Sequence, residues 1–407
     1  MVNVIGLGYI GLPTALMLAS HGIEVVGTDY NKALVDSLNA GVPTFKEDGL
    51  DELFKDAVDA GIKFTNEYQH TDTYIVAVPT PYDKFSKKVD ACYVKAAVNN
   101  VLNVCNAGAT IIVESTVSPG TIDKEVRPLI AERGFVTGRD IHLVHAPERI
   151  LPGNMIYELV NNNRTIGADE PEVAGRVRDI YASFCKGEIV LTDIRTAEMT
   201  KVVENTFRAV NIAFANELSR ICRHDNMDVY EIIRICNKHP RVNIMNPGPG
   251  VGGHCISVDP WFLVGDYPQL TKVIGESMKV NDSQPDFVLE RLQVIMQENN
   301  IKDASRVGLY GITYKENVYD YRDSPTLQLL ESQARHLAAP LKCYDPFLEN
   351  MKLTESQYSD FDAFINDVDI VVVMVKHDHI CHNWDRLKDK IVLDCHNICP
   401  LPNTYRL

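Results

Sequence analysis

Three glycines near the N-terminus, Gly6, Gly8 and Gly11, follow the spacing G-x-G-x-x-G. They stand between an apolar strand-like run and a helix-like run. In that setting the glycines permit a tight turn, close approach of a ligand and close helix packing. Asp29 follows Gly6 by 23 residues, at the end of a second apolar run, where a carboxylate can accept hydrogen bonds from ribose hydroxyls. This order predicts a dinucleotide-binding βαβ unit.

The same segment indicates which dinucleotide is bound. Tyr9 and Ile10 lie inside the glycine loop, whose backbone N–H groups and helix N-terminus suit a pyrophosphate. The Asp29 carboxylate would repel a 2'-phosphate, which favours NAD over NADP, although Lys32 nearby is compatible with both. We therefore expect NAD as the cofactor.

Apolar strand-like runs alternate with amphipathic helical runs through the first third of the chain. This rhythm predicts a doubly wound parallel sheet with helices on both faces. The expected strands are 2–6, 24–29, 74–78, 110–114 and 142–145, and the first helix is 11–21.

The middle of the chain is helical. Residues 196–224 show apolar residues at helical spacing without proline or glycine, which predicts one long helix and a subunit contact. Further helix is expected at 229–236 and 270–299. From residue 306 the α/β rhythm returns without a second G-x-G-x-x-G, which suggests the same architecture with a different ligand. The runs there are strands at 306–312, 341–346, 369–375 and 390–397, and a helix at 325–336.

Three domains follow from this organisation, with boundaries near 195 and 300. We expect an NAD-binding Rossmann domain at 1–195 and a helical dimerisation domain with a cysteine loop at 196–300. A second Rossmann-like domain would occupy 301–407. The predicted fold class is therefore α/β, with two doubly wound sheets joined by a long central helix.

Composition excludes several classes of partner. The formal net charge of −15 argues against nucleic acid or an anionic membrane as the main partner. No apolar run approaches the ~20 residues that span a bilayer. The ten cysteines are scattered without paired spacing, which favours reduced thiols, and Met1 leads directly into a strand without a signal peptide. We expect a cytoplasmic protein.

A second glycine-rich segment, NPGPGVGGHCISVDP, carries Cys255 about 245 residues after the first. Its glycines, Gly252 among them, allow backbone to approach a ligand closely. A thiolate beside a nicotinamide can carry an aldehyde through a thioester to an acid, and Asp259 could serve proton transfer. The alternative is a Pro/Gly surface loop with an incidental cysteine.

Two strand ends carry hydroxyl side chains. Thr80 and Pro81 follow one expected strand, and Ser115 and Thr116 follow another. Ligands of such sheets bind beyond the carboxyl ends of the strands, which places these residues near cofactor or substrate. Ordinary turn chemistry explains them equally well.

A carboxylate and a helix face complete the candidates. Glu148 in APERILPGN follows the strand 142–145 and is either a general base or water-orienting group, or a solvated loop carboxylate. Lys201, Asn205 and Arg208 share one face of the long helix, where they could bind an oxyanion or a sugar hydroxyl. The alternative is the solvated stripe of an amphipathic helix.

A histidine-rich segment resembles a metal site at first sight. It contains His377, His379, Cys381 and His382 directly after an expected strand. No second pair of ligands stands at zinc-finger distance, so we predict a polar strand-end loop and no metal.

Six motifs in fixed order together resemble those of the nucleotide-sugar 6-dehydrogenases, the UDP-glucose/GDP-mannose dehydrogenase family. They are GLGYIG, ESTVSPGT, APERILPGN, TKVVENTFRAVNIAFANEL, GGHCISVDP and GITYKENVYDYRDSP, and they span nearly the whole chain. The resemblance implies an NAD-binding domain, a helical dimerisation core and a UDP-binding domain. It also implies a four-electron oxidation of a sugar C6 alcohol to a carboxylate with two NAD⁺.

The resemblance also implies roles for individual residues. Cys255 would attack the C6 aldehyde, and the resulting thiohemiacetal would be oxidised to a thioester that water hydrolyses. Glu148, Asp259 and Thr116 would position or activate water, Thr116 also placing the cofactor. Lys201 and Asn205 would stabilise oxyanions. Further contacts are expected from Arg149, Ile150, Arg208, Gly252 and Lys315 to the substrate, from Arg322 to the cofactor, and from Arg241 to the substrate of a neighbouring subunit in a homodimer.

The substrate loop departs from the pattern of UDP-glucose enzymes, which read PEF followed by a second glutamate. Here PERILPGN supplies Arg149 and Asn154, which looks like the branch acting on UDP-2-acetamido sugars for surface polysaccharide precursors. UDP-N-acetyl-D-mannosamine is the leading substrate, with UDP-N-acetylglucosamine and UDP-glucose as alternatives.

Two competing classes of function are a two-electron hydroxy-acid or 6-phosphogluconate-type dehydrogenase and a non-catalytic NAD-responsive sensor.

Overall fold

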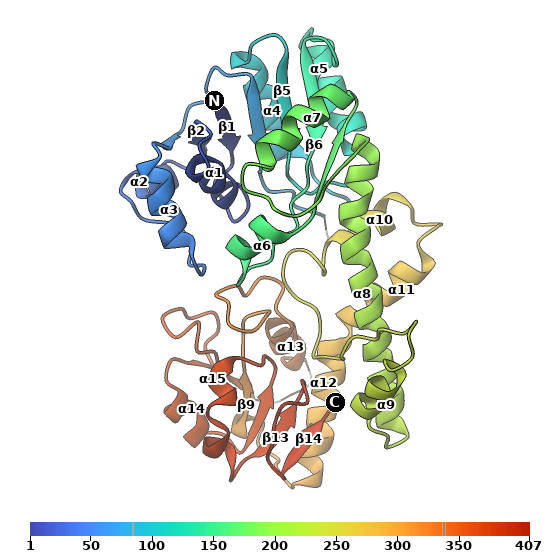
Figure 1. Ribbon diagram of the computed structural model, residues 1–407. Coiled ribbons are helices and arrows are strands. Elements are labelled where there is room, and N and C mark those ends of the chain that lie inside the picture. The colour runs from blue at the N-terminus through green and yellow to red at the C-terminus, as the bar shows by residue number, and fades with distance from the viewer. Residues whose placement is uncertain (84, 336, 338) are drawn as a thin grey trace. The chain divides into compact units, whose positions relative to one another are not determined.

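The structure is a computed structural model that describes residues 1–83, 85–335, 337 and 339–407. It divides into two compact units, Met1–Glu204 and Asn205–Leu407, each of which is described by itself. Helix α8 (Ile194–His224) is the predicted long helix, and the boundary between the units falls within it (Figure 1). The three-domain division at 195 and 300 stays a prediction.

The first unit is built on an eight-stranded sheet in the order β3-β2-β1-β4-β5-β6-β7-β8. Every neighbouring pair is parallel except β6 with β7, which is antiparallel and was not anticipated from the sequence. The order reverses direction between β1 and β4, which makes this pair the switch point where ligands bind in such folds. The strands are β1 (Val2–Ile5), β2 (Val25–Thr28), β3 (Lys63–Thr65), β4 (Thr73–Val76), β5 (Ala109–Val113), β6 (Ile141–His145), β7 (Arg164–Ala168) and β8 (Ile189–Thr192).

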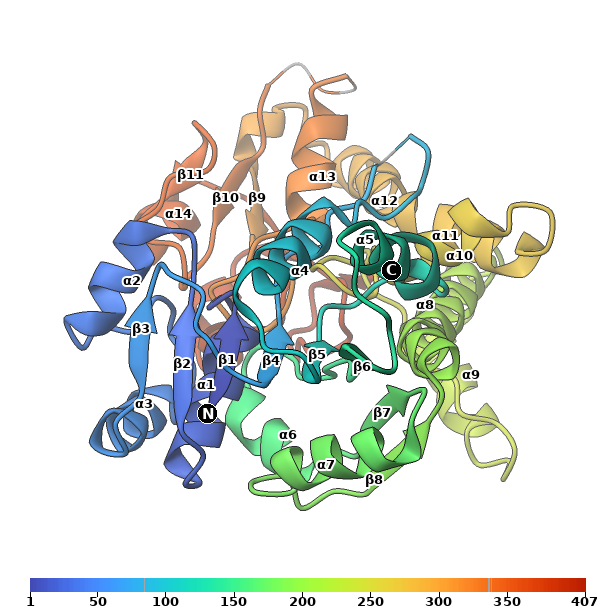
Figure 2. The ribbon, with the colours of Figure 1, turned by 90° about the horizontal axis from the view of Figure 1, so that it is seen from above.

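Both faces of this sheet are covered, as predicted. Val4 and Ile75 belong to the core on one face, whereas their neighbours Ile5 and Val76 belong to the core on the other. Figure 2 shows α4 and α5 on one side of the strands and α6 and α7 on the other. The helices are α1 (Gly11–Ser20), α2 (Lys32–Asn39), α3 (Leu50–Asp59), α4 (Cys92–Val104), α5 (Arg127–Glu132), α6 (Met155–Asn161) and α7 (Pro171–Tyr181), with a π-helical turn η1 (Ile122–Val126).

The second unit contains a six-stranded, all-parallel sheet in the order β11-β10-β9-β12-β13-β14. This repeats the order of the first six strands of the first unit, and its switch point lies between β9 and β12. The strands are β9 (Val307–Tyr310), β10 (Lys342–Tyr344), β11 (Gln357–Tyr358), β12 (Ile370–Val373), β13 (Ile391–Asp394) and β14 (Thr404–Arg406). The helices are α9 (Val229–Cys236), α10 (Asp259–Asp266), α11 (Lys272–Asp282), α12 (Gln284–Glu298), α13 (Pro325–Gln333), α14 (Phe361–Asn366) and α15 (Asp378–Cys381), with 3-10 turns η2 (Ala304–Arg306) and η3 (Trp384–Leu387).

Two helix predictions need correction. The single helix expected at 270–299 is two helices, α11 and α12, which meet at Ser283. Pro285 lies in the first turn of α12, where the helix has no use for the N–H that proline lacks. In the interior of one continuous helix the same proline would break the backbone hydrogen bonding, so the chain starts a new helix here. The helix expected at 325–336 is α13, which ends at Gln333, and His336 lies outside the described residues.

Two further observations concern the whole described chain. None of its helices within the described ranges combines the length and the apolar character that crossing a bilayer requires. All ten cysteines lie in the described ranges, and no disulfide bond joins any two of them, in agreement with the scattered spacing.

Candidate active site

The glycine loop between β1 and α1 has two glycines that the fold requires and one that it does not. Gly6 has φ +88°, and a Cβ there would lie 2.5 Å from the Ala77 carbonyl oxygen. A Cβ on Gly11 would lie 1.8 Å from the carbonyl oxygen of Gly6. A Cβ on Gly8, in contrast, would have none of the described atoms within 4 Å. Packing therefore does not explain Gly8, whereas the close approach of a pyrophosphate does, so the loop fits a dinucleotide.

Asp29 links this loop to the end of β2. Its carboxylate is buried and accepts hydrogen bonds from the backbone N–H of Leu7 and of Asn31, each at 2.8 Å. A carboxylate has about four acceptor positions, so capacity remains for ribose hydroxyls. Lys32 is exposed and lies 3.7 Å from the Asp36 carboxylate on the surface of α2.

The start of α1 is open to an anion. Its N-cap residue is Ile10, whose side chain makes no capping hydrogen bond. Tyr9 stacks on Phe45 with ring centroids 4.4 Å apart, which fixes the outer side of the glycine loop. An uncapped helix N-terminus beside the glycine turn is the arrangement that binds phosphates.

The ends of β4 and β5 are joined by Ser115. Its Oγ accepts a hydrogen bond from the Val78 N–H at 2.9 Å and donates to the Val78 carbonyl oxygen at 2.7 Å. This residue therefore shapes the loop that carries Thr80 and Pro81, both half-buried, and Thr116 beside it is half-buried as well. Their predicted contacts with the cofactor stay predictions.

Glu148 is buried rather than solvated. Its Oε1 accepts hydrogen bonds from the N–H groups of Arg149 at 2.6 Å and Ile150 at 3.2 Å, and Arg164 Nη2 donates to its Oε2. Arg164 Nη1 also lies 3.6 Å from Glu114 Oε1. Burial raises the pKa of Glu114 to about 7, although Arg164 opposes that rise. Sequence analysis did not identify Glu114 and Arg164 as site residues. The signal that could have identified them is a charged residue at the edge of an apolar strand.

The expected substrate loop after Glu148 is held by other carboxylates. Glu158 Oε2 accepts the Leu151 N–H at 2.8 Å. Glu47 accepts the N–H groups of Gly153 and Met155, both at 2.9 Å. These bonds fix the backbone of a loop that would otherwise have unpaired donors.

Arg149 has partners of its own in the first unit. Its guanidinium contacts Glu204 Oε1 at 2.9 Å, Thr165 Oγ1 at 2.7 Å and the Asn163 carbonyl oxygen at 3.2 Å. Its predicted contact with the substrate stays a prediction, and the structure adds a role in holding the loop against β7.

The polar face of α8 is not a solvated stripe. Lys201 and Asn205 are both buried, and Arg208 is half-buried. Polar side chains such as these are rarely buried without a specific partner, so their burial argues against a solvated stripe on an amphipathic helix.

Asn205 on α8 is bonded to Asp259, which lies in the same turn as Cys255 in the second unit. Asn205 Nδ2 donates to Asp259 Oδ2 at 2.6 Å, and both side chains are buried. The Cys255 carbonyl accepts the N–H of Asp259 at 2.8 Å and of Val258 at 3.1 Å. One turn therefore carries both the half-buried thiol and the buried carboxylate.

Tyr314 explains two glycines of the cysteine loop. A Cβ on Gly252 would lie 2.8 Å from Tyr314 Cβ, and one on Gly253 would lie 2.7 Å from Tyr314 Cε2. Gly253 also has φ +81° and donates its N–H to the Arg322 carbonyl at 2.9 Å. Burial raises the pKa of Tyr314, and the charges of Asp320 and Cys255 raise it further. The sequence reading missed this tyrosine.

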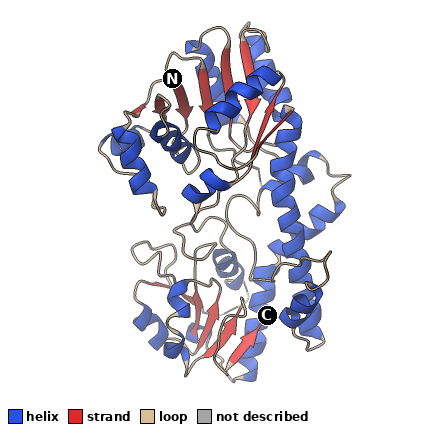
Figure 3. Ribbon diagram, in the orientation of Figure 1, coloured by secondary structure: helices blue, strands red, loops and turns tan. Residues whose placement is uncertain are grey.

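The loop that leads to Cys255, residues 237–258, has neither helix nor strand (Figure 3). Its backbone is anchored to α8 by two asparagines. Asn211 Oδ1 accepts the Met245 N–H at 2.9 Å, and Asn216 Oδ1 accepts the Gly248 N–H at 3.0 Å. Arg241 is exposed at the start of this loop. The loop is thus irregular but fixed.

The remaining candidates of the second unit lie in the segment after β9. Arg322 is exposed and forms an ion pair with Asp320, Nη2 to Oδ2, at 2.6 Å. Lys315 is half-buried, and its carbonyl accepts the hydroxyl of Thr313 at 3.1 Å. Their predicted contacts with cofactor and substrate stay predictions.

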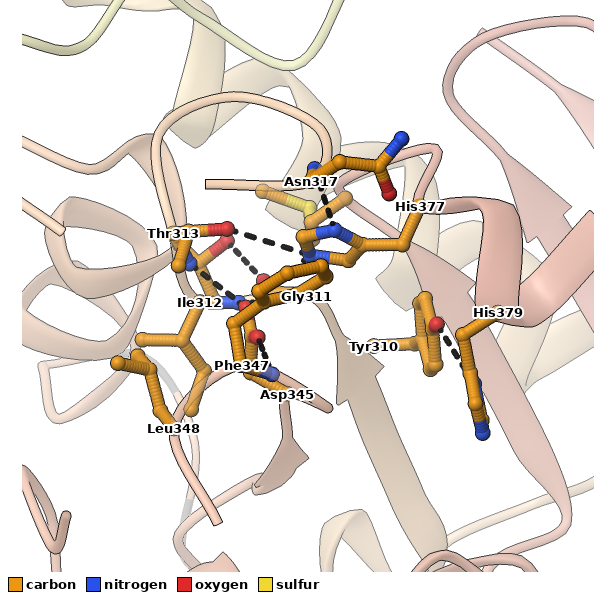
Figure 4. Close-up of polar contacts among 12 residues, drawn as sticks. Tyr310, Gly311, Ile312, Thr313, Asn317, Asp345, Phe347, Leu348, His377 and His379 are labelled. Atoms are coloured by element: carbon orange, nitrogen blue, oxygen red, sulfur yellow. Dashed lines mark hydrogen bonds and ion pairs between the residues drawn. The ribbon is translucent and has the colours of Figure 1, made fainter. Parts of the chain in front are cut away.

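Asp345 in the second unit repeats the place of Asp29 in the first. It follows β10 and accepts the N–H groups of Ile312 at 2.6 Å and Thr313 at 2.8 Å, in the loop after β9 (Figure 4). Gly311 there has φ +93°, as Gly6 has φ +88°. The two units thus share one turn construction.

The ligand end of this second turn differs. Ser324 caps α13 by accepting the N–H groups of Thr326 at 3.2 Å and Leu327 at 3.4 Å. Asp345 also accepts the Phe347 N–H at 2.8 Å and is fully buried. The N-terminus of α13 is capped by Ser324, and the Asp345 carboxylate accepts three backbone N–H groups. This turn therefore differs from the glycine loop of the first unit, and the difference supports the expectation of a different ligand.

The histidine-rich segment serves packing. His377 is fully buried, with Nε2 3.2 Å from Asp345 Oδ2, and its Nδ1 accepts the Asn317 N–H at 2.9 Å (Figure 4). His379 Nδ1 lies 3.0 Å from the Tyr310 hydroxyl. Within the described part of the chain, no group of three or more His, Cys, Asp or Glu side chains could hold a metal ion.

Comparison with known proteins places these observations in a family. Three models of the UDP-glucose/GDP-mannose dehydrogenase family match the chain: the NAD binding domain at 1–185, the central domain at 195–283 and the UDP binding domain at 308–400.

Relatives match along almost the entire chain. UDP-N-acetyl-D-mannosamine dehydrogenase of Methanocaldococcus jannaschii is 40% identical, covering 98% of this chain and 92% of the relative. NDP-N-acetyl-D-galactosaminuronic acid dehydrogenase of Ralstonia nicotianae is 38% identical, covering 97% and 95%. The structure of a UDP-D-ManNAc dehydrogenase from Pyrococcus horikoshii matches with a TM-score of 0.91 at 34% identity, covering 100% of this chain and 98% of that one.

Proposed function

Because the chain belongs to the UDP-glucose/GDP-mannose dehydrogenase family and is an NAD-dependent nucleotide-sugar dehydrogenase, we propose that it oxidises a UDP-2-acetamido sugar at C6 to the uronate. The observation that carries this proposal is the turn that joins Cys255 to Asp259, with Asn205 bonded to that carboxylate at 2.6 Å. A two-electron alcohol dehydrogenase has no use for a thiol in such a turn, whereas a four-electron enzyme needs a nucleophile that retains the aldehyde.

The residues of the glycine loop would hold the cofactor. Gly8 and the uncapped start of α1 suit the pyrophosphate, and Asp29 suits the adenosine ribose. When bound, NAD⁺ supplies the hydride acceptor for each of the two oxidations.

The cysteine accounts for the second oxidation. The Cys255 sulfur, as thiolate, bonds to the aldehyde carbon, and the carbonyl oxygen takes a proton to give a thiohemiacetal. Loss of hydride and of that proton yields a thioester. Water then adds to the thioester carbon, the C–S bond breaks, and the uronate leaves with the thiolate restored.

The polar residues would serve the charges that develop along this path. In the proposal, Lys201 and Asn205 stabilise the oxyanion at C6. Glu148 serves as the base for the alcohol and for the attacking water, and Asp259 supports the activation of that water. Thr116 would help to place that water. The burial of both carboxylates supports these roles, because a carboxylate charge in a low-dielectric environment attracts a proton more strongly than it does in water.

The choice of sugar rests on the loop after Glu148 and on the relatives. PERILPGN lacks the second glutamate that UDP-glucose enzymes have at this place, and relatives about 40% identical are named for N-acetylmannosamine. Another relative at 38% is named for N-acetylgalactosaminuronic acid. We therefore propose that UDP-N-acetyl-D-mannosamine is the substrate and that the product is a precursor for surface polysaccharide synthesis.

We also propose a homodimer that forms through α8. Phe207, Phe214 and Ile221 are 67%, 52% and 50% exposed and recur at intervals of seven residues along one side of this helix. A stripe of large exposed apolar side chains with that spacing is typical of a helix–helix contact. Arg241, exposed in the loop 237–258, would then reach the substrate of the partner subunit.

The test is the stoichiometry of NADH on a panel of UDP-sugars. The purified protein should form two NADH for each UDP-N-acetyl-D-mannosamine consumed, and less product with UDP-N-acetylglucosamine and UDP-glucose. Cys255→Ala should lose net uronate formation while it still binds NAD⁺. One NADH per sugar, or full turnover by Cys255→Ala, would overturn the thioester route.

A further inference from the structure

Glu148 belongs to a buried group of charges whose other members, Glu114 and Arg164, have no part in the reaction scheme above. Glu114 follows β5, Glu148 lies three residues beyond β6, and Arg164 begins β7. Their exposed fractions are 1%, 7% and 4%. Three adjacent strands thus bring two carboxylates and one guanidinium together inside the first unit.

The guanidinium is divided between the two carboxylates. Arg164 Nη2 donates to Glu148 Oε2, and Nη1 lies 3.6 Å from Glu114 Oε1. The charge centre of Arg164 lies 4.5 Å from the ring centroid of Tyr181 and 5.2 Å from that of Phe184, which fixes its position. The Tyr181 hydroxyl in turn donates to Glu114 Oε1 at 3.1 Å.

The charges of this group do not balance when both carboxylates are ionised. One cation then faces two anions, and uncompensated buried charge is costly. Accordingly, burial, opposed by Arg164 and assisted by the charge of Glu148, raises the pKa of Glu114 to about 7. Thr14 on α1 and Tyr181 on α7 also face this carboxylate, and Cys185 faces Arg164.

We propose that Glu114 and Arg164 are positioning residues for Glu148, and that the charge on Glu114 decides how much of the Arg164 guanidinium Glu148 retains. When Glu114 is neutral, the guanidinium pairs with Glu148 alone and restrains it as a proton acceptor. When Glu114 is ionised, it competes for the guanidinium and adds a second negative charge, so Glu148 takes a proton from the attacking water more readily. This inference rests on the role proposed above for Glu148 in thioester hydrolysis.

The experiment follows the acyl-enzyme directly. The enzyme is mixed with saturating NAD⁺ and UDP-N-acetyl-D-mannosamine, quenched at intervals, and the fraction carrying sugar on Cys255 is measured by intact mass. In the wild-type enzyme, loss of the acyl group should accelerate about three- to tenfold as the pH rises through about 7. Glu114→Gln removes the titrating group, so its rate should stay near the slow, low-pH value across the range.

Two further variants separate positioning from a general loss of fold. Arg164→Lys keeps a charge beside Glu148 and should retain most of the hydrolysis rate. Arg164→Met removes the group that orients Glu148, and this loss of orientation outweighs the loss of the restraining charge, so the variant should accumulate acyl-enzyme at every pH. Glu172→Gln removes an exposed carboxylate of α7 and serves as the matched control, with an unchanged profile.

The outcomes are distinct. If Glu114→Gln keeps the acceleration through pH 7, or slows both oxidations equally with no change in the shape of the profile, the inference is overturned. If the wild-type enzyme itself never carries sugar on Cys255, the proposed function fails instead.

Discussion

The side chain of Asn205 donates a hydrogen bond to the carboxylate of Asp259 across 2.6 Å, and both groups are buried. This bond joins α8 to the first residue of α10, whose N–H is bonded to the Cys255 carbonyl. The orientation of the Asp259 carboxylate, in the same turn as Cys255, therefore depends on an amide that lies 54 residues earlier in the chain.

Asn205→Ala tests that dependence. The variant removes the charge-assisted bond from Asn205 to the Asp259 carboxylate, which is worth about 1.5–3 kcal/mol, so kcat should fall about 10- to 100-fold. KM for NAD⁺ should not change, since Asn205 is expected to act on the sugar. Steady-state kinetics measure both constants, and Asn350→Ala, at an exposed position between β10 and β11, is the control. An unchanged kcat would refute the role of the pair.

The glycine loop predicts opposite behaviour for two similar substitutions. Gly8→Ala adds a Cβ into open space, so the fold should remain as stable as before while affinity for NAD⁺ falls at least tenfold. Gly11→Ala places a Cβ 1.8 Å from a carbonyl oxygen and should destabilise the protein by about 1–3 kcal/mol or more. Thermal unfolding and NAD⁺ titration, run on both variants, distinguish them. Equal effects on stability would contradict the assignment.

Gly253 and Tyr314 are predicted to be energetically coupled. Gly253→Ala meets the tyrosine ring at 2.7 Å and forces an alanine into φ +81°, which together should cost about 2–4 kcal/mol of stability. Tyr314→Ala removes the ring, so the glycine substitution should cost about 1 kcal/mol in that background. Chemical denaturation of the four proteins in a double-mutant cycle measures the difference. Additive effects would show that the ring does not shape the loop.

The stability of the protein should decrease in mild acid because of His145. Burial lowers the pKa of this fully buried histidine on β6 to about 4, against an ordinary value of about 6.5. Below about pH 6.5 the unfolded chain takes up a proton that the folded chain does not. The free energy of unfolding is therefore highest above that pH and falls by about 3 kcal/mol as the pH drops towards 4.

His145→Leu removes this contribution. Urea titrations between about pH 4 and pH 7 should show a flatter pH dependence for the variant than for the wild-type protein. His21→Leu, on the surface at the end of α1, should leave the pH dependence as it is in the wild type. A wild-type slope in His145→Leu would mean that another group causes the acid sensitivity.

Much of this architecture could be predicted because its signals are local. The glycine spacing, Asp29 and the alternation of apolar runs lie within short segments. They predicted the first βαβ unit and the return of the α/β rhythm from residue 306. The break at Ser283 was missed because Pro285 stands inside an otherwise helical pattern and is tolerated in a first turn.

The residues that the sequence did not reveal are brought together by long-range packing. Arg164 reaches Glu148 and Glu114 only because β7 lies beside β6, which in turn lies beside β5. Tyr314 is 61 residues from Gly253 and meets it through the fold of the second unit. No periodicity or motif encodes such pairs, because each depends on strand order and loop path.

The covalent state of Cys255 during turnover tests the proposed thioester route directly. Enzyme quenched with NAD⁺ and UDP-N-acetyl-D-mannosamine should carry the oxidised sugar nucleotide on the peptide that contains Cys255, and this mass should disappear when the substrate is exhausted. Cys255→Ala should carry none. Steady production of uronate with Cys255 unmodified throughout, or an equal yield from Cys255→Ala, would contradict the thioester route.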